Sequence, residues 1–197
     1  MAPALPIVRP AHYSDMTDID TMKSLQHPMD DFGYCPRCGS RHFGVNDPKS
    51  KICADCGFVL YHNSAAAVAA IVVDENDRLL VTRRAFEPAR HTLDLPGGFV
   101  DPGEEAETAV RREVFEETGC RVRTADYLFS LPNAYVYSAH TVHTTDLFFR
   151  CTIEGCGAAM AHDDAAEVLW IPKAELDPAQ FGLASIRKGV ARLLKTL

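Results

Sequence analysis

The chain has 197 residues, of which 47% are hydrophobic, and a formal net charge of −7 at pH 7. This length accommodates one substantial hydrophobic core and a small satellite module, and the apolar fraction excludes a wholly disordered chain. The acidic balance weighs against a nucleic-acid partner, because backbone binding requires basic surface. The sequence shows no signal-peptide pattern and no apolar run of about 18 residues, so we expect a cytoplasmic protein without a membrane span.

Residues 1–31 are predicted to form an N-terminal arm. Three prolines among the first ten residues favour an extended backbone. Residues 14–26 have apolar side chains at the spacing of a short helix. A frayed arm and a dimer contact both remain open for this segment.

Two C-x2-C pairs lie within residues 32–62, with fourteen residues between them, one short of the usual zinc spacing. Cys35, Cys38, Cys53 and Cys56 therefore predict a structural zinc ribbon with four thiolate ligands. A redox dithiol or two disulfides are the alternatives, and the pairing of two such motifs favours zinc. So short a segment has no core of its own, so Zn²⁺ would supply much of its folding free energy. No disulfide is expected among the seven cysteines.

An apolar, β-branched run predicts a buried strand at residues 66–73, followed by a turn and a returning strand at 78–84. The loop that follows carries His91, a candidate for substrate contact whose alternative is a solvated side chain. Residues 93–97 predict a further short strand.

The stretch from Gly98 to Cys120 predicts a turn and one helix. An Asp-Pro-Gly turn is followed by acidic residues of a first helical turn, and Gly119 supplies a stop, so the helix is expected at about 105–118. Glu113, Glu116 and Glu117 fall within an arc of about 100° that continues the apolar stripe of the same helix.

Carboxylates on an inward face repel one another and oppose the helix dipole. Bound divalent cations offset these costs, and hard oxygen ligands of this kind suit Mg²⁺ or Mn²⁺. Arg112 is placed to hold neighbouring carboxylates. The alternative is an ordinary glutamate-rich surface helix.

The same stretch resembles the Nudix hydrolase signature, G-x5-E-x7-R-E-U-x-E-E-x-G-U, where U is a bulky aliphatic residue. The matching positions are Gly98, Glu104, Arg112, Glu113, Val114, Glu116, Glu117 and Gly119. Cys120 replaces the last aliphatic position. The resemblance implies an α/β fold, a Nudix-type α/β/α sandwich with a mixed sheet at residues 63–197, preceded here by the zinc ribbon.

The resemblance also implies roles for single residues. The Gly98 carbonyl and the carboxylates of Glu113, Glu116 and Glu117 would hold magnesium or activate water, with Arg112 orienting them. In this fold Arg83 and Arg84 end a strand near the substrate's phosphates, which makes them candidates for substrate binding. Surface charge is the alternative for both. The ribbon resembles those of NADH pyrophosphatase-like members, where it is structural.

Strands are expected at residues 121–131 and 141–153, with residues 130–138 between them. Ser130, Pro132 and Ser138 agree with a motif of NADH pyrophosphatases, S-Q-P-W-P-F-P-x-S, but its Gln, Trp and later prolines are absent. Tyr135 and Tyr137 are candidates to stack on a base, and core packing is the alternative. We interpret His140 and His143 as polar strand positions.

An acidic loop precedes a strand that contains Trp170, as in many Nudix proteins. Glu167 is the candidate in this loop for the catalytic base or a further metal ligand, with Asp163 and Asp164 behind it. The alternative is an exposed acidic loop. Residues 182–197 predict a closing helix with an apolar face.

The sequence therefore predicts a metal-dependent hydrolase that cleaves the pyrophosphate of nucleoside diphosphate-X substrates such as ADP-ribose, NADH or FAD. A nucleotide-sensing protein without catalysis is the alternative, and an RNA-cap hydrolase is disfavoured by the charge. A small nucleotide, Mg²⁺ or Mn²⁺ and Zn²⁺ are the expected ligands. The oligomeric state stays open, with a homodimer as a candidate because dimers are common in the family.

Overall fold

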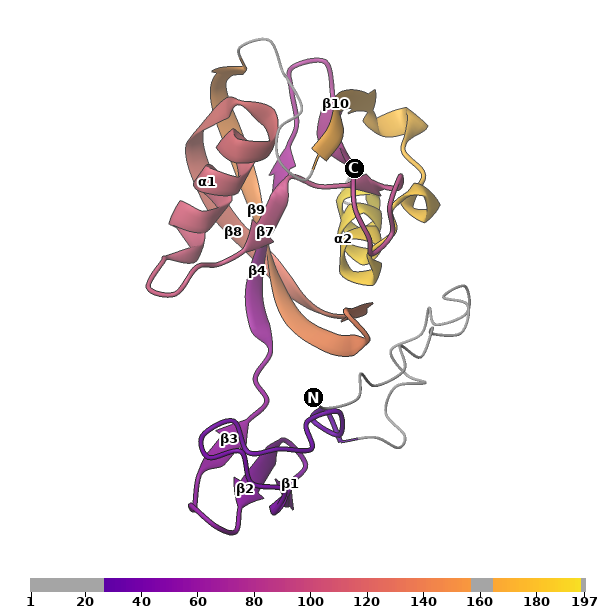
Figure 1. Cartoon of the computed structure of the whole chain (residues 1–197). Coiled ribbons are helices and arrows are strands. Elements are labelled where there is room, and N and C mark those ends of the chain that lie inside the picture. The colour runs from indigo at the N-terminus through magenta and orange to yellow at the C-terminus, as the bar shows by residue number, and fades with distance from the viewer. Residues whose placement is uncertain (1–26, 157–164, 196–197) are drawn as a thin grey trace.

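The computed structural model describes residues 27–156 and 165–195. A small ribbon near the N-terminus is joined by one strand to a larger α/β domain (Figure 1). The helix predicted within residues 14–26 and the acids Asp163 and Asp164 lie outside the described residues.

The ribbon is a three-stranded antiparallel sheet in the order β1-β2-β3. Its hydrophobic cluster has only three buried members, Cys35, Phe43 and Cys53. Two of these three are cysteines of the predicted zinc site, so the ribbon's core and its candidate metal site coincide. The strands are β1 (Phe43–Asp47), β2 (Ser50–Cys53) and β3 (Val59–Tyr61).

The α/β domain contains two sheets, one in the order β7-β4-β9-β8 and one in the order β10-β5-β6. Strand β4 is parallel to β9 and antiparallel to β7, which makes the first sheet mixed, as predicted. The elements are β4 (Ala65–Val72), β5 (Arg78–Arg84), β6 (Leu93–Asp94), β7 (Gly97–Phe99), α1 (Ala106–Thr118), β8 (Cys120–Tyr137), β9 (His140–Cys156), β10 (Ala165–Pro172) and α2 (Ala184–Lys195), with 3-10 turns at Lys173–Glu175 and Pro178–Gln180.

The two helices cover opposite sides of the sheets (Figure 1). Alternation along β4 divides its side chains between two cores: Ala69 and Ile71 pack towards α2, whereas Val68, Ala70 and Val72 pack towards α1. A strand buried on both faces must be apolar at nearly every position, which explains the uninterrupted run in the sequence. The predicted α/β/α sandwich fold is confirmed.

The short strand predicted at residues 93–97 is in fact divided between the two sheets. Strand β6 pairs with β5 in one sheet, and β7 pairs with β4 in the other. The chain crosses between them at Leu95 and Pro96, and the Pro96 carbonyl accepts a hydrogen bond from the Ala70 amide at 2.8 Å. After this crossing, Gly97 and Gly98 lie in β7, beside the crossover between the two sheets.

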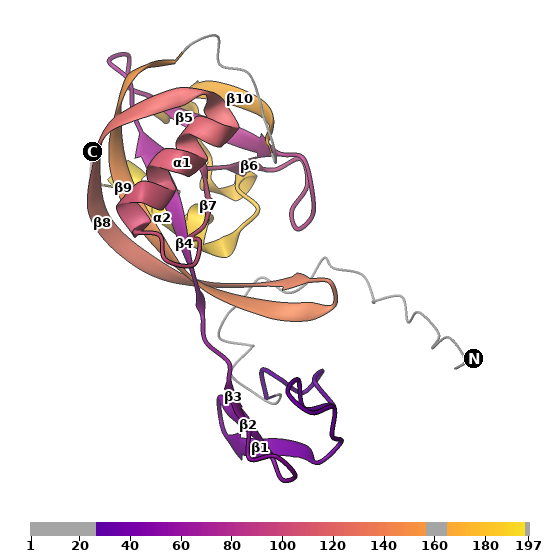
Figure 2. The ribbon, with the colours of Figure 1, turned by 60° about the vertical axis from the view of Figure 1, so that its left-hand side comes forward.

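Strands β8 and β9 form one long hairpin that extends from the domain towards the ribbon (Figure 2). Residues 130–137, which the sequence analysis set between two strands, are part of β8. Ser138 and Ala139 make the turn with φ of 51° and 64°. Strand β8 is at the sheet edge, where a proline such as Pro132 is tolerated.

The open end of this hairpin is closed by a disulfide between Cys120 and Cys156. These two residues are cross-strand partners, 36 residues apart in the sequence. The expectation that the chain has no disulfide is therefore wrong. The pairing depends on the register of two strands, which the spacing of the cysteines does not reveal.

In the described part of the chain, no helix has both the length and the apolar character needed to cross a membrane.

Candidate active site

The turn before α1 forms as its sequence predicts. The Glu104 amide donates to the Asp101 carbonyl at 3.0 Å, and Gly103 takes a φ of 85° that side chains with a Cβ rarely adopt. Glu105 caps the N-terminus of the helix, and Gly119 ends it in the left-handed conformation. The helix, Ala106–Thr118, agrees with the predicted range.

One face of α1 fixes the helix on the domain. Ala109, Val110 and Val114 are fully buried in the core beneath it. The predicted carboxylates continue this stripe at the edge of the core: Glu113 and Glu117 are half-buried, whereas Glu116 is exposed.

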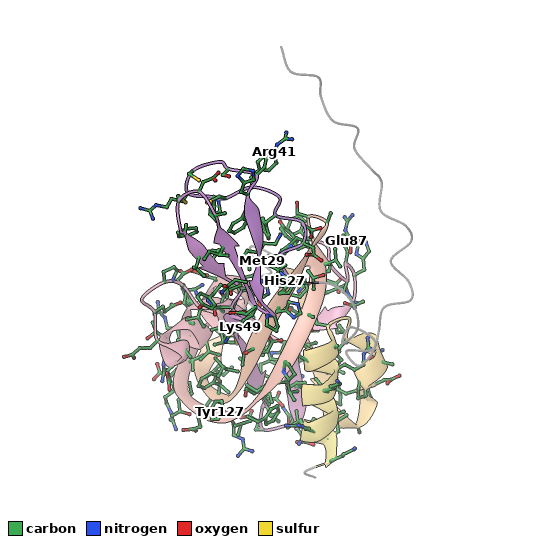
Figure 3. The ribbon with its side chains drawn as sticks, turned by 90° about the horizontal axis from the view of Figure 1, so that it is seen from below. His27, Met29, Arg41, Lys49, Glu87 and Tyr127 are labelled. Atoms are coloured by element: carbon green, nitrogen blue, oxygen red, sulfur yellow. A yellow bond between two sulfur atoms is a disulfide. The ribbon has the colours of Figure 1, made fainter. Side chains whose placement is uncertain are left out.

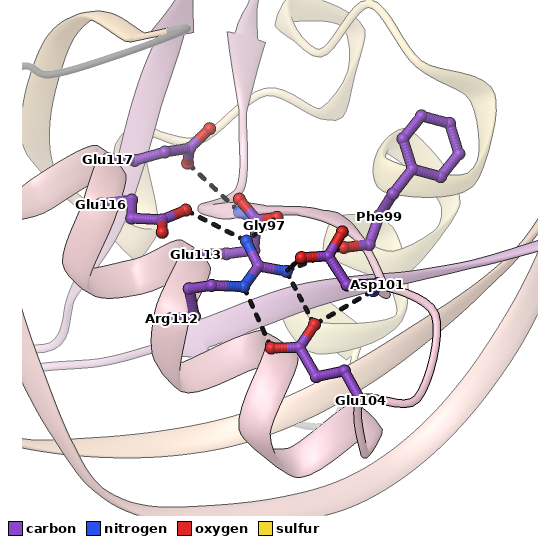
Figure 4. Close-up of polar contacts among 8 residues, drawn as sticks. All are labelled: Gly97, Phe99, Asp101, Glu104, Arg112, Glu113, Glu116 and Glu117. Atoms are coloured by element: carbon purple, nitrogen blue, oxygen red, sulfur yellow. Dashed lines mark hydrogen bonds and ion pairs between the residues drawn. The ribbon is translucent and has the colours of Figure 1, made fainter.

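Arg112 is the centre of the polar network on this helix (Figure 4). Its guanidinium donates to both carboxylate oxygens of Glu104 at 3.0 and 2.8 Å, to Glu113 at 2.8 Å and to Glu116 at 3.0 Å. It also donates to the Phe99 carbonyl at 3.1 Å, which ties the helix to β7. The role predicted for Arg112, holding neighbouring carboxylates in place, agrees with this geometry.

The network contains more carboxylates than cations. The Arg112 hydrogen bonds lower the pKa of Glu104, and the same bonds, from Glu104 first, raise the pKa of Arg112. Burial raises the pKa of Glu113 despite its ion pair with Arg112. One guanidinium thus serves a group of carboxylates that desolvation already penalises, and a divalent cation would relieve the excess negative charge.

The crossing between the sheets brings the backbone of Gly97 and Gly98 against these carboxylates. The Gly97 amide donates to Glu117 at 3.2 Å, and a Cβ on Gly98 would lie 2.5 Å from a Glu113 carboxylate oxygen. A glycine at residue 98 allows the Glu113 carboxylate to lie against the backbone, because any Cβ there would displace it. The atoms here that could bind a metal ion are all oxygens, the ligand type that Mg²⁺ and Mn²⁺ prefer. These residues therefore fit the divalent ions predicted from the sequence.

A cavity of about 350 Å³ opens beside this cluster. It is lined by five of the predicted site residues, which come from α1, β5, β7 and the long hairpin. They are Gly98, Glu117, Arg84, Tyr135 and Tyr137. The cavity therefore joins the carboxylate cluster to an aromatic wall.

Arg83 and Glu167 lie elsewhere. They face one another across β5 and β10 in an ion pair of 2.8 Å, with Glu167 exposed. Among the described residues that line the cavity, neither of the two is present. The loop residue His91 is likewise exposed, and its carbonyl accepts a hydrogen bond from Arg83.

The four predicted zinc ligands meet in the ribbon. The Cys35 and Cys56 sulfurs are 3.7 Å apart, as are those of Cys38 and Cys53, and all four ligand atoms lie within 4.8 Å of one another. A tetrahedral Zn²⁺ with bonds of about 2.3 Å requires sulfurs about 3.8 Å apart. The cluster fits a zinc ribbon.

Two carboxylates in the cavity were missed by the sequence analysis. Asp94 and Asp146 are 7% and 5% exposed, and both line the cavity. Each is a charged residue that directly precedes apolar residues within a predicted strand, and this placement is the signal that would have found them.

The interpretation of His140 and His143 as polar strand positions is incomplete. Both rings approach His62 at the end of the ribbon, with centroids 6.2 and 5.2 Å away. Phe32 packs on His140 at 5.0 Å, and Asp31 lies 3.3 Å from the His140 ring nitrogen. In Figure 3, His27 and Met29 lie beside Lys49 on the same small module. The histidines therefore join the hairpin to the ribbon.

The sequence profile of the NUDIX domain matches residues 63–194, well over half of the chain. The chain belongs to the Nudix hydrolase family. Nudix hydrolase 19, chloroplastic, from Arabidopsis thaliana is 39% identical over 102 residues, which are 50% of this chain and 23% of that protein. The NAD-capped RNA hydrolase NudC of Vibrio parahaemolyticus is 30% identical over 126 residues, which are 63% of this chain and 48% of that protein.

This chain therefore spans less than half the length of either of these Nudix relatives. Its fold is similar to the crystal structure of a NUDIX hydrolase from Nitrosomonas europaea, with a TM-score of 0.66 at 20% identity. That match covers 82% of this chain and 90% of the other.

Proposed function

We propose that this chain hydrolyses the pyrophosphate of nucleoside diphosphate-X substrates in a reaction that depends on divalent metal ions. The observation that carries the proposal is the junction of the carboxylate cluster on α1 with the cavity, which meet at Gly98 and Glu117. A binding site for the pyrophosphate beside a pocket for the rest of the nucleotide is the arrangement that such a substrate needs.

Bound Mg²⁺ or Mn²⁺ would neutralise charge on the diphosphate and lower the pKa of the attacking water. Glu113, Glu116 and the Gly98 carbonyl would hold the ions, and Arg112 would fix the carboxylates. Glu117, which reaches both the Gly97 amide and the cavity, would accept the proton of the water. The products would be a nucleoside monophosphate and a second phosphate ester.

Tyr135 or Tyr137 would stack on a ring of the substrate, and Arg84 would bind a substrate phosphate only after its ion pair with Asp94 opens. Glu167 and Arg83 would act only after their mutual ion pair opens, as a second base and a second phosphate ligand.

The decisive experiment is a turnover assay of Glu117→Gln with Mg²⁺ and with Mn²⁺. The substrates are ADP-ribose, NADH, FAD, diadenosine polyphosphates and an NAD-capped RNA, the last because of the name of the Vibrio relative. We expect the variant to lose about 10²–10⁴-fold in kcat, the usual contribution of a general base. Glu107→Gln is the matched control, because Glu107 is an exposed acid in the first turn of the same helix.

Unchanged turnover of Glu117→Gln would remove Glu117 from the mechanism. Tight binding of ADP-ribose by the wild-type chain, with no turnover in either metal, would favour the nucleotide-sensing alternative.

We also propose that residues 32–62 form a structural zinc ribbon and residues 63–197 the catalytic domain, with residues 1–31 as an arm. Metal analysis of the purified chain tests the zinc, with one Zn²⁺ per chain expected. Cytoplasmic localisation is a separate proposal: four reduced thiolates in the ribbon favour a reducing compartment, whereas the disulfide between Cys120 and Cys156 favours an oxidising one. Sedimentation measurements decide between a monomer and a homodimer.

A further inference from the structure

The inner end of the cavity is formed by two acids from different sheets. Asp94 ends β6, and Asp146 lies in β9, where its strand neighbours Val142 and Thr144 also line the cavity. Burial raises the pKa of both carboxyls, and for Asp94 the charge of Asp146 raises it further. Both groups line the same cavity.

Neither acid is saturated by its protein partners. Asp146 accepts from the hydroxyls of Thr144 and Ser185 and from the Asn133 side chain, and Asp94 accepts from Arg84 and the Leu95 amide. An ionised carboxylate offers about four acceptor positions. Asp146 therefore retains about one and Asp94 about two.

A further acceptor without a donor lies next to Thr144, on a residue that is not itself part of the cavity lining. The side-chain oxygen of Asn133 is buried and has no hydrogen-bond partner among the described residues. Asn133 and Thr144 are cross-strand partners, and the next pair on that face of the hairpin is Tyr135 and Val142. A ring stacked at Tyr135 would point its edge towards these acceptors.

The charges exclude anions from this end. Arg84, the cation of the lining, is already bound to Asp94 at 2.6 Å, while Glu87 and Glu117 add to the acids around the cavity. The remaining surface is largely apolar and includes Val68, Leu95 and Ile186. A flat, uncharged ring whose edge donates hydrogen bonds fits such a surface, whereas a phosphate or carboxylate does not.

We propose that Asp146, with Asp94 beside it, selects substrates whose nucleobase presents an amino group, as adenine does, in nucleoside diphosphates linked to X. This inference rests on the proposed function and names its substrate class. The pyrophosphate lies on the carboxylate cluster of α1, and the amino edge of the base lies on Asp146. An oxo group at that position faces only acceptors and is rejected.

The test compares ADP-ribose with its hypoxanthine analogue, which has a carbonyl in place of the 6-amino group. The wild-type chain is expected to favour ADP-ribose in kcat/KM by about 10–100-fold, the cost of leaving a buried charged acceptor without its donor. Asp146→Asn replaces an acceptor by an amide that also donates. The preference is expected to fall to near unity or to reverse.

Ser185→Ala is the matched control. It removes the hydrogen bond between Asp146 and α2 but keeps the carboxylate in the cavity. If Asp146 only anchors the helix, Ser185→Ala and Asp146→Asn will both lower the melting temperature and neither will change the preference. That result overturns the inference, as does equal kcat/KM for the two substrates in the wild-type chain.

A binding measurement separates this inference from the proposed function. Calorimetry of ADP and IDP on the wild-type chain with Mg²⁺ requires neither turnover nor a variant that folds. Tighter binding of ADP by about tenfold or more supports the inference even if no substrate is hydrolysed. Equal binding of the two overturns it even if hydrolysis is efficient.

Discussion

The ribbon and the α/β domain are stabilised in different ways. The α/β domain has two hydrophobic clusters, one under each helix, and its acidic cluster is mounted on a helix that these cores already hold. The ribbon has a cluster of three buried residues, two of which are candidate metal ligands. A metal would therefore create the structure of the ribbon, whereas in the domain it would only use a structure that already exists.

The difference extends to the ligand atoms. The four sulfurs of the ribbon surround one point and leave no open position, as structural zinc sites do. The oxygens on α1 border a cavity and remain open on that side. A closed sulfur site suits stability, and an open oxygen site suits chemistry on a bound substrate.

The largest expected effect comes from removing a sulfur ligand. Zinc binding supplies about 10–16 kcal/mol to small zinc modules, far more than the ribbon's few buried side chains, so Cys53→Ser should unfold the ribbon and release zinc. The α/β domain should stay folded because its cores are independent of the metal. Zinc analysis and amide hydrogen exchange measure the two parts separately.

Cys151→Ala is the control for this substitution, because Cys151 is a buried thiol in the α/β core and far from the ribbon in sequence. It should leave the zinc content unchanged. Full retention of zinc and of ribbon protection in Cys53→Ser would contradict the contrast drawn between the two regions.

The next effect concerns the disulfide between Cys120 and Cys156. In the chain-entropy description, a crosslink with a sequence separation of 36 stabilises the native state by about 4 kcal/mol. Cys156→Ser should therefore lower the denaturant midpoint of the domain while the domain remains folded at 25 °C. Reductant should lower the midpoint of the wild-type chain and leave that of the variant unchanged, and equal midpoints for both chains would show that the crosslink adds no stability.

The ribbon and the signature helix could be predicted from sequence because their signals are local. Two closely spaced cysteine pairs define the ribbon, and a turn, an acidic start and Gly119 define α1 within a single segment. The same is true of the hairpin between β4 and β5, where Asp77 takes a positive φ in the predicted turn.

The parts that could not be predicted depend on register between distant strands. The disulfide, the shared cavity of Asp94 and Asp146, and the contact of His62 with His143 each involve segments tens of residues apart. The hairpin turn at Ser138 and Ala139 also lacked its usual signal, because neither residue is the glycine or asparagine that favours positive φ. Such contacts follow from the assembled sheet rather than from any short pattern.

The adjacent residues Gly97 and Gly98 allow effects on stability to be compared with effects on catalysis. A Cβ at Gly97 would lie 2.0 Å from the Val68 carbonyl oxygen, a backbone atom that cannot move alone, so Gly97→Ala should destabilise the domain by about 1–3 kcal/mol. A Cβ at Gly98 would meet only the tip of the Glu113 side chain, which can swing aside. Gly98→Ala should therefore keep the melting temperature but lower kcat by about 100-fold, since the displaced carboxylate no longer holds its ion in place.

Melting temperatures and turnover of the two glycine variants, measured side by side, check this prediction. A Gly98→Ala variant that is as active as wild type would show that the approach of the backbone to Glu113 has no part in catalysis. A Gly97→Ala variant with unchanged stability would show that β7 can shift away from β4 without cost.

The smallest expected effect is a pH dependence at the junction of the two regions. Burial, followed by the charges of neighbouring imidazoles, lowers the pKa of His62 and of His143, while Asp31 faces His140 in the same cluster. The unfolded chain, with histidine pKa values of about 6.5, therefore binds protons before the folded chain does. The contribution of this contact to stability is complete above that pH and is lost as the pH falls through the lowered values.

Between pH 8 and 5 the melting temperature should drop more steeply for wild type than for His143→Gln, whereas His91→Gln, at an exposed loop position, should keep the wild-type slope. Because the opposite face of the same hairpin carries Tyr135 and Val142 into the cavity, the KM for substrate should rise over the same pH range in the wild-type chain. Parallel slopes for all three chains would show that the ribbon and the hairpin are not coupled through these rings.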